Sequence, residues 1–277
     1  MSKKYELTPE TQKENGKTLY RIKALRDFGD VKAGDLGGWV ESESNLDHVG
    51  DCWVFDNAEV SGDAWLSGDA RVYGNAQVYG DARVFGNARV YGNAQVYGDA
   101  RVYGDAWLSG DAWVYGDAWV YGDARVFDNA EVFGNAEVSG NAEVSGDARV
   151  SGDARVFGNA EVSGDARVYG DAWVYGDARV FDNAEVFGNA EVSGNAEVSG
   201  DARVYKKSHI ITFSGFGSLA RTTTAFKTEA SFHISCGCFK GTLEEFRAAI
   251  SETHGDNKFG REYKLIAYLI ELHFSEE

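Results

Sequence analysis

A six-residue repeat constrains this chain more than any other feature. From Val54 to Val204 every sixth residue is Val, or Leu at Leu66 and Leu108, which gives 26 hexads without an insertion. The residue two places before each of these is Ala, except in the first hexad, where it is Cys52. The unit reads Gly-(Asp/Asn)-Ala-x-Val-(Tyr/Phe/Ser), so the fold must accommodate the same short segment many times over.

Strand geometry explains the hexad. In an Ala-x-Val strand, Ala and Val point to one face and x to the other, and x is Arg, Glu, Gln or Trp. Gly followed by Asp or Asn supplies a corner, because these residues tolerate positive φ. A two-residue strand followed by a corner predicts a prism with one hexad on each side and an apolar interior.

Three hexads per coil is the expected turn of this prism, so that positions i and i+18 lie one above the other in about nine coils. Residues Gly122–Val150 and Gly176–Val204 are near copies displaced by nine hexads, which is three whole coils. The unusual corners at Asp56, Asp128 and Asp182 are separated by twelve and then nine hexads, both multiples of three. We therefore expect these three corners to stack on one edge.

The pattern resembles the left-handed parallel β-helix of the hexapeptide-repeat family. The resemblance lies in an aliphatic residue followed four positions later by a small one, as in Val72-Tyr73-Gly74-Asn75-Ala76. It implies an all-β solenoid, a left-handed parallel β-helix, over residues 50–205. The family is often trimeric, which implies a homo-oligomer, most often a trimer.

The flanks are expected to cover the open ends of the solenoid, because exposed strand edges favour aggregation. Residues 1–49 form the predicted N-terminal cap, with strands at Leu19–Ile22 and Gly34–Val40. Residues 206–277 form the predicted C-terminal α+β domain. Its expected strands are Ile210–Phe213, Thr222–Phe226 and Phe232–Cys238. The capping box Thr242–Glu245 is expected to open one helix, and a second is expected over Glu262–Phe274.

Composition predicts an intracellular protein. Three cysteines do not make a disulfide framework, and the N-terminus lacks the apolar stretch of a signal peptide. No segment approaches the ~18 consecutive apolar residues of a membrane span. We therefore expect a cytoplasmic protein, with no membrane partner.

Catalysis is not expected. The best-known hexapeptide-repeat proteins are acyltransferases with a His general base, and related carbonic anhydrases bind zinc through His. Here no His lies between His48 and His209, and no Lys between Lys32 and Lys206. General-base and metal chemistry need such groups, so we predict no enzyme activity, no cofactor and no metal.

Two clusters in the C-terminal domain have both a functional and a plain interpretation. The set His233, Cys236, Cys238 and His254 offers zinc ligands, but its spacing is not a common zinc pattern, and buried structural thiols are the favoured account. Gly215–Ser218 resembles a fragment of a phosphate-binding loop that lacks the following Lys and helix. A β-turn is the favoured interpretation there.

Aromatic side chains are the predicted partner-binding surface. With three hexads per coil, Trp neighbours Arg in several outward columns, as at Arg101 and Trp119, and the aromatic residues after Val form further columns. Column stacking that merely stabilises the solenoid is the plain alternative. Surfaces rich in Trp and Tyr are also typical of interfaces. The predicted partner-binding residues are Tyr79, Tyr97, Trp107, Trp113, Tyr115, Trp119 and Tyr121.

Charge suggests a second hypothesis. The chain has a formal net charge of −17, and residues 50–205 hold 18 Asp, 8 Glu and 10 Arg with no Lys. Rows of corner Asp make an acidic surface that could mimic DNA and inhibit a nucleic-acid enzyme. Free alternation of Asp with Asn fits turn propensity alone, so both accounts stay open. Direct nucleic-acid binding is disfavoured by the charge.

Taken whole, the chain resembles hexapeptide-repeat proteins common in phage and prophage genomes. The resemblance lies in Phe28-Gly-Asp-Val31, Gly34–Val40, the hexads, Cys236–Thr242 and His254–Asn257. It implies a phage or prophage protein of no established activity, located in the cytoplasm of a bacterial host cell. We expect a non-catalytic scaffold that binds a host protein or other host macromolecule and counteracts host defence. The alternatives are a DNA mimic, and a small-ligand sponge or enzyme sited in residues 206–277.

Overall fold

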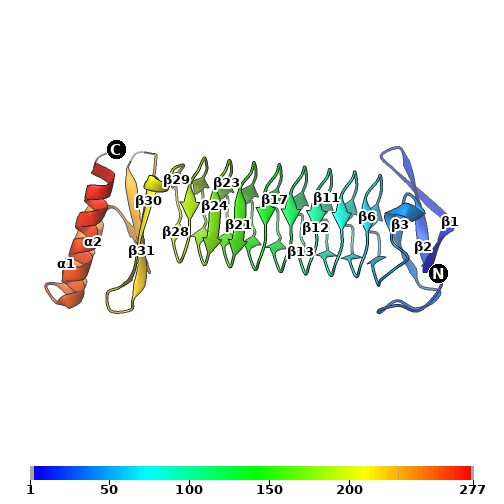
Figure 1. The fold of residues 1–277 in the computed structure, drawn as a ribbon, viewed down its shortest axis with the longest axis horizontal. Helices are drawn as coiled ribbons and strands as arrows, with labels where there is room; N and C mark the ends of the chain where they lie inside the picture. Colours follow the sequence, from blue (N-terminus) through cyan, green and yellow to red (C-terminus); the bar gives the residue numbers. More distant parts are fainter. Residues whose placement is uncertain (1–2, 230, 276–277) are drawn as a thin grey trace. The chain divides into compact units, whose positions relative to one another are not determined.

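The computed structural model describes residues 3–229 and 231–275. The chain divides into two compact units, Met1–Asp153 and Ala154–Glu277. Figure 1 colours the chain from its N-terminus to its C-terminus and shows the short parallel strands of each unit side by side in successive coils. The sequence boundaries at residues 49/50 and 205/206 stay a prediction.

Each hexad forms one short strand, made of x and the aliphatic residue, and β21 and β24 extend two residues further. In the first unit the strands are β4 (Trp53–Val54), β5 (Glu59–Val60), β6 (Trp65–Leu66), β7 (Arg71–Val72), β8 (Gln77–Val78), β9 (Arg83–Val84), β10 (Arg89–Val90), β11 (Gln95–Val96), β12 (Arg101–Val102), β13 (Trp107–Leu108), β14 (Trp113–Val114), β15 (Trp119–Val120), β16 (Arg125–Val126), β17 (Glu131–Val132), β18 (Glu137–Val138), β19 (Glu143–Val144) and β20 (Arg149–Val150). In the second they are β21 (Arg155–Gly158), β22 (Glu161–Val162), β23 (Arg167–Val168), β24 (Trp173–Gly176), β25 (Arg179–Val180), β26 (Glu185–Val186), β27 (Glu191–Val192), β28 (Glu197–Val198) and β29 (Arg203–Val204).

Three hexads make one coil. Each strand pairs in parallel with the strand three hexads further on, as Arg89 with Trp107, and Val90 with Leu108. The first unit has three rows of such strands, β5 to β20, β4 to β19 and β6 to β18, and the second unit has three rows of three strands. The prediction of a parallel β-solenoid with about nine coils is confirmed, counted over both units. The left-handed sense of the coil stays a prediction.

Ala and Val fill the interior. Every hexad Ala and aliphatic residue from Ala58 to Val204 is at most 1% exposed, so the interior is packed and holds no channel. Val suits a strand because its branched side chain packs well on a pleated surface, and Ala leaves room for the neighbouring corner. The predicted alternation of an apolar inside and an outward x is confirmed.

The corners need left-handed backbone. The Gly of the hexad has positive φ, for example +72° at Gly116. Asp takes its place at Asp56 and Asp128, with φ of +54° and +60°. Each of these carboxylates accepts a hydrogen bond from the backbone N–H of the corner one coil further on, at 3.2 and 3.3 Å. Both corners follow strands of one row, β4 and β16, as the spacing predicts.

The N-terminal residues cover the first coil. β1 (Tyr5–Glu14), β2 (Lys17–Ala24) and β3 (Leu36–Val40) form an antiparallel meander, and β3 then runs parallel to β5. A short 3₁₀ turn, η1 (Glu43–Asn45), follows. The buried Lys4 ammonium donates to the carbonyl of Cys52 at 2.9 Å, which satisfies an open edge.

Two details of this cap differ from expectation. β1 was not predicted, because its polar residues do not alternate with apolar ones. Trp53 was predicted to face outward but is only 1% exposed. Its ring lies under Phe28, at a centroid distance of 5.2 Å, so the cap covers the outer face of the first hexad.

The C-terminal domain belongs to the second unit. After η2 (Lys207–His209), β30 (Ile210–Phe216), β31 (Arg221–Lys227), β32 (Phe232–Cys236) and β33 (Phe239–Gly241) make an antiparallel sheet in sequence order. α1 (Leu243–His254) begins at the predicted capping box, in which Thr242 and Glu245 exchange hydrogen bonds, and α2 (Lys258–Ser275) follows. Both helices pack on the sheet around Ile234. Figure 1 shows the two helices in orange and red beside the sheet.

The sequence misplaced one strand end. The strand expected to reach Cys238 ends at Cys236, because Gly237 turns the chain with φ of +62°. Phe239–Gly241 then returns as a fourth strand that the sequence did not predict, since three residues are too few for a periodic pattern. The second predicted helix is confirmed and begins four residues earlier, at Lys258.

Within the second unit, the sheet contacts the last coils. Thr224 accepts a hydrogen bond from the backbone N–H of Glu197, and Ser235 donates one to its carboxylate, both at 3.2 Å. Ala202 and Thr228 form an isolated β-bridge. The exposed backbone of the final coil is therefore partly covered, as predicted for a cap.

We predict that Gly116→Ala destabilises the protein more than Gly194→Ala. Both positions have positive φ, +72° and +62°, which costs an Ala about 1–2 kcal/mol. A Cβ at Gly116 would also lie 3.1 Å from the backbone nitrogen of Gly134, whereas one at Gly194 meets nothing within 4 Å. Urea denaturation followed by circular dichroism measures both free energies of unfolding. Equal losses would mean that the close approach of coils costs nothing.

Candidate functional site

The predicted partner-binding aromatics lie on different faces of the solenoid. Trp107, Trp113 and Trp119 belong to β13, β14 and β15, which sit in three different sheets, so they ring one coil as expected. One flat partner surface cannot contact all three faces of a prism at once. The seven predicted residues therefore separate into three groups.

The largest group forms a continuous aromatic column. Tyr79, Tyr97 and Tyr115 stack in parallel with successive centroid distances of 4.9 Å, and Phe133 continues the stack at 4.9 Å. Trp113 lies edge-on to Tyr97 at 6.3 Å and is 41% exposed. We call Tyr79, Tyr97, Tyr115, Phe133 and Trp113 the aromatic face.

The other two groups are smaller. Tyr121 stacks on Tyr103 at 5.0 Å, and Trp119 lies edge-on to Tyr103 at 6.4 Å. Arg101 lies 5.0 Å from the Trp119 ring, which confirms that predicted cation–π contact. Trp107, 41% exposed, contacts Tyr91 at 5.4 Å. Part of each group's surface is thus used in contacts between coils.

Polar groups on the columns also pair between coils. The Tyr115 hydroxyl donates to the carboxylate of Glu131 at 3.2 Å. Burial and this carboxylate raise the pKa of Tyr115 to about 12. Arg125 and Glu143, one coil apart, form an ion pair at 3.3 Å. These contacts support the stabilising role that the sequence left open, although exposed pairs contribute little.

Corner Asp and Asn form ladders. The amide of Asn87 donates to the carboxylate of Asp105, and Asn135 to Asp153, each at 2.8 Å. Alternation of Asn with Asp therefore has a structural use, because an amide between carboxylates supplies a donor. In one column, four consecutive coils carry Asp without an intervening Asn: Asp63, Asp81, Asp99 and Asp117.

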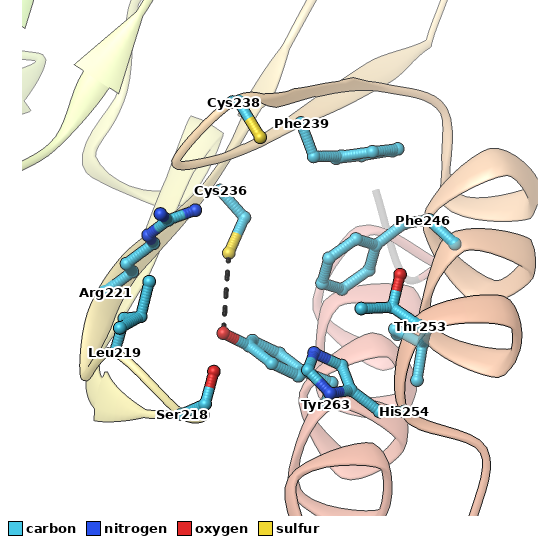
Figure 2. A pocket seen from close by; sticks show the side chains of 12 residues that line it. Ser218, Leu219, Arg221, Cys236, Cys238, Phe239, Phe246, Thr253, His254 and Tyr263 are labelled. Atoms are coloured by element: carbon cyan, nitrogen blue, oxygen red, sulfur yellow. Dashed lines mark hydrogen bonds between the residues drawn. The ribbon is translucent and has the colours of Figure 1, made fainter.

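A cavity of about 270 Å³ lies in the C-terminal domain, between the β30–β31 turn, β32, the β32–β33 turn and the two helices. Figure 2 shows its walls. The apolar walls are Leu219, Phe239, Phe246, Ala249 and Ile250, and the polar groups are Ser218, Arg221, Cys236, Cys238, Thr253, His254 and Tyr263. The sequence did not predict this cavity, since its residues come from four separate stretches of the chain.

Tyr263 lies at the centre of the cavity wall. Its hydroxyl accepts a weak hydrogen bond from the Cys236 thiol at 3.9 Å, and its ring stacks on His254 at 5.5 Å. Burial and the neighbouring Cys236 thiol raise its pKa to about 12. Of the segment Gly215–Ser218, predicted to be a turn, Gly215 and Phe216 end β30 and only Gly217 and Ser218 lie in the turn. A Cβ at Gly217 would collide with the Tyr263 hydroxyl. Glycine there lets the turn close over the tyrosine.

Arg221 places positive charge at the rim of this cavity. It begins β31, and its guanidinium packs so closely against Gly237 that a Cβ there would collide with it. Figure 2 shows its side chain beside Cys236 and Leu219. Cation and apolar wall together form an environment suited to an anion carried on an apolar body.

The candidate zinc set is not assembled. Within residues 3–229 and 231–275, no group of three or more His, Cys, Asp or Glu is placed to hold a metal ion. Cys236 is buried and accepts a hydrogen bond from Thr223 at 3.2 Å. Cys238 was predicted to be a buried thiol on the same strand face, but it lies in the turn and is exposed. No helix in the described part of the chain is long and apolar enough to span a membrane.

Comparison with known proteins supports the repeat. A family model described as the YdcK β-solenoid repeat matches residues 64–80, 76–92, 82–96, 94–110, 148–162 and 160–176. A protein named uncharacterized acetyltransferase YdcK, from Escherichia coli strain K12, is 42% identical over 43 residues. That match covers 16% of this chain and 13% of the relative. The solenoid is therefore similar to YdcK repeats, and the stretches that the family model matches lie outside the C-terminal domain.

We predict that the free energy of unfolding falls less at alkaline pH in the Tyr263→Phe variant than in the wild type. The folded-state pKa of Tyr263, about 12, lies above the ordinary value of 10. Above pH 10 the unfolded chain therefore loses this proton first, and stability falls as pH rises toward 12. The variant should reduce that fall by less than about 1 kcal/mol per pH unit. Denaturation at several pH values measures it, with Tyr205→Phe, at 42% exposure, as control. Identical pH profiles for wild type and Tyr263→Phe would contradict the assignment.

Proposed function

We propose that this chain is a non-catalytic binding protein whose solenoid is a scaffold and whose binding site is the C-terminal cavity. The observation that carries the proposal is the combination of a 270 Å³ apolar cavity with the Arg221 guanidinium at its rim. Ligand sites typically have this form, with apolar walls and a few polar groups that fix orientation.

The chemistry of the cavity favours binding over catalysis. A tyrosine with a pKa of about 12 stays protonated at neutral pH and makes a poor base. In the described part of the chain, no hydroxyl or thiol is hydrogen-bonded to the ring of His254, so no nucleophile is activated there. The word acetyltransferase in the name of the relative describes that protein, and its match covers only a small part of this chain.

The lining indicates the chemistry of the ligand. Leu219, Phe239 and Phe246 accommodate an apolar body, and Arg221 pairs with an anionic head. A carboxylate on an aliphatic chain has both parts. Such a group exists as a free acid or as part of a host macromolecule, and the expected host partner would present it to the cavity.

We predict that octanoate binds more tightly than 1-octanol, because only the acid pairs with Arg221. Isothermal titration calorimetry on the full chain measures both affinities. Arg221→Gln should weaken octanoate roughly tenfold and leave octanol nearly unchanged. Ala249→Phe should abolish binding of both by filling the cavity. Binding of a peptide that ends in leucine is then measured with its terminal carboxyl group free and with that group amidated. This comparison tests whether the ligand is part of a macromolecule or a free acid.

Ala248→Phe is the matched control. Ala248 is exposed on the same helix and does not line the cavity, so this variant should bind octanoate like the wild type. Equal affinity of octanoate for the Ala249→Phe and Ala248→Phe variants would place binding elsewhere. Equal affinities for octanoate and 1-octanol would show that Arg221 does not pair with the carboxylate.

The aromatic face supports a second candidate, direct binding of a host protein by the solenoid. Its favouring observation is the exposed Trp113 beside three stacked tyrosines, since Trp and Tyr dominate binding energy at many interfaces. The phage or prophage setting implied by the resemblance would supply a host protein as the partner. The Asp63, Asp81, Asp99 and Asp117 column is what supports DNA mimicry instead.

For this second candidate we predict that Trp113→Ser loses a partner that Trp173→Ser retains. The two indoles are equally exposed, at 41% and 42%, but Trp173 lies outside the aromatic face. Affinity capture from bacterial lysate with mass spectrometry compares the variants. DNA mimicry would be favoured if both variants still capture a nucleic-acid enzyme and that enzyme elutes at moderate salt, because the binding would then be mainly electrostatic. Identical partners for both variants would exclude the aromatic face.

A further inference from the structure

Helix α2 is apolar on two faces, and only one of them is covered within the C-terminal domain. Ile266, Ala267 and Ile270 face the sheet and are at most 2% exposed. On the other side lie Leu265, Tyr268, Leu269 and Leu272, which are 65%, 58%, 45% and 48% exposed. We call these four residues the outer stripe.

The outer stripe has the spacing of a helix-packing surface. Its residues are at positions i, i+3, i+4 and i+7, so they form one continuous ridge along the helix. A helix that is apolar on nearly all sides is normally buried on all sides. Scattered exposed leucines need no explanation, but a contiguous ridge of four large side chains indicates an interaction surface.

We propose that the outer stripe is covered by the outer stripe of a second copy of this chain, with the two α2 helices antiparallel about a two-fold axis. A two-fold contact uses the same surface on both copies, so a single self-complementary ridge is sufficient. The interface would be a pair of helices with Leu265, Tyr268, Leu269 and Leu272 interleaved.

The charges of α2 favour an antiparallel pair. Lys258, Arg261 and Lys264 lie in its first half, and Glu271 lies in its second half. Antiparallel pairing sets the basic first half of one copy against Glu271 of the other, while parallel pairing opposes like charges. Glu262, the exception in the first half, is already bonded to the backbone N–H of Gly217 at 3.0 Å.

Lys264 and Glu271 are the pair to test. They are two helical turns apart and flank the outer stripe on the same side. With the two-fold axis between Tyr268 and Leu269, Lys264 faces the second copy's Glu271 with an axial offset of about 3 Å. Their present partners, Asp256 at 2.6 Å and Arg247 at 2.7 Å, form exposed pairs that exchange at little cost.

Net charge also favours this location. Residues 50–205 carry a net charge of −16, so contact between two repeats would bring like charges together. Residues 206–277 hold nine Lys plus Arg and nine Asp plus Glu, so that segment is neutral. Two neutral domains associate without this repulsion. The inference thus replaces the trimer implied by the resemblance with a two-fold dimer.

Sedimentation velocity on the full chain across a dilution series tests the proposal. We expect a dimer that Leu269→Glu converts to a monomer, with unchanged helicity because Leu269 is exposed. Leu219→Glu is the matched control: Leu219 is 66% exposed in the same domain but lies outside α2, and this variant should remain dimeric. A wild-type monomer, a trimer, or a dimer unaffected by Leu269→Glu would overturn the proposal.

A charge exchange tests the antiparallel arrangement. Lys264→Glu and Glu271→Lys should each weaken the dimer roughly tenfold, because each places like charges opposite one another at two symmetry-related points. The double variant should regain the wild-type dissociation constant. Failure of the double variant to recover, with each single variant weakened, would show that the two residues do not face each other and would overturn the arrangement.

Discussion

Closure of the interior by Ala and Val is the interaction on which the rest depends. Each side of a coil supplies one small and one branched side chain, both buried, and the largest side chain at an inward hexad position is Leu. Such a short strand cannot stand alone, so each gains its backbone hydrogen bonds from the coils before and after it. Corners must therefore stack closely, which forces glycine or a strained Asp wherever φ is positive.

This dependence explains why the sequence predicts the solenoid so well and the sites so poorly. A period of six repeated 26 times determines which residues face inward, and even the Arg101–Trp119 contact follows from spacing. The cap departs from periodicity, so β1 and the burial of Trp53 escaped prediction. The cavity was missed for a related reason. It joins a turn, two strand ends and two helices, and only the tertiary fold brings Arg221, Tyr263 and His254 to one place.

The two parts of the chain differ in what their side chains contact. In the solenoid, polar and aromatic side chains mostly contact their equivalents in the next coil, as Tyr79 does with Tyr97. In the C-terminal domain, side chains of different kinds converge on one space, and α2 carries an apolar ridge that the domain does not cover. Chemical diversity in a small volume is what selective binding needs. The proposed ligand and the proposed second copy both use this domain.

The uninterrupted hexad also determines how such a protein can change length. Insertion or loss of three hexads, or of any multiple of three, leaves every later side chain on its original face. Loss of a single hexad would rotate all later columns by one side of the prism and set Trp, Arg and Glu beside new neighbours. The near copies Gly122–Val150 and Gly176–Val204, displaced by three whole coils, obey this rule. The solenoid can thus lengthen by whole coils while the faces on which its side chains lie stay the same.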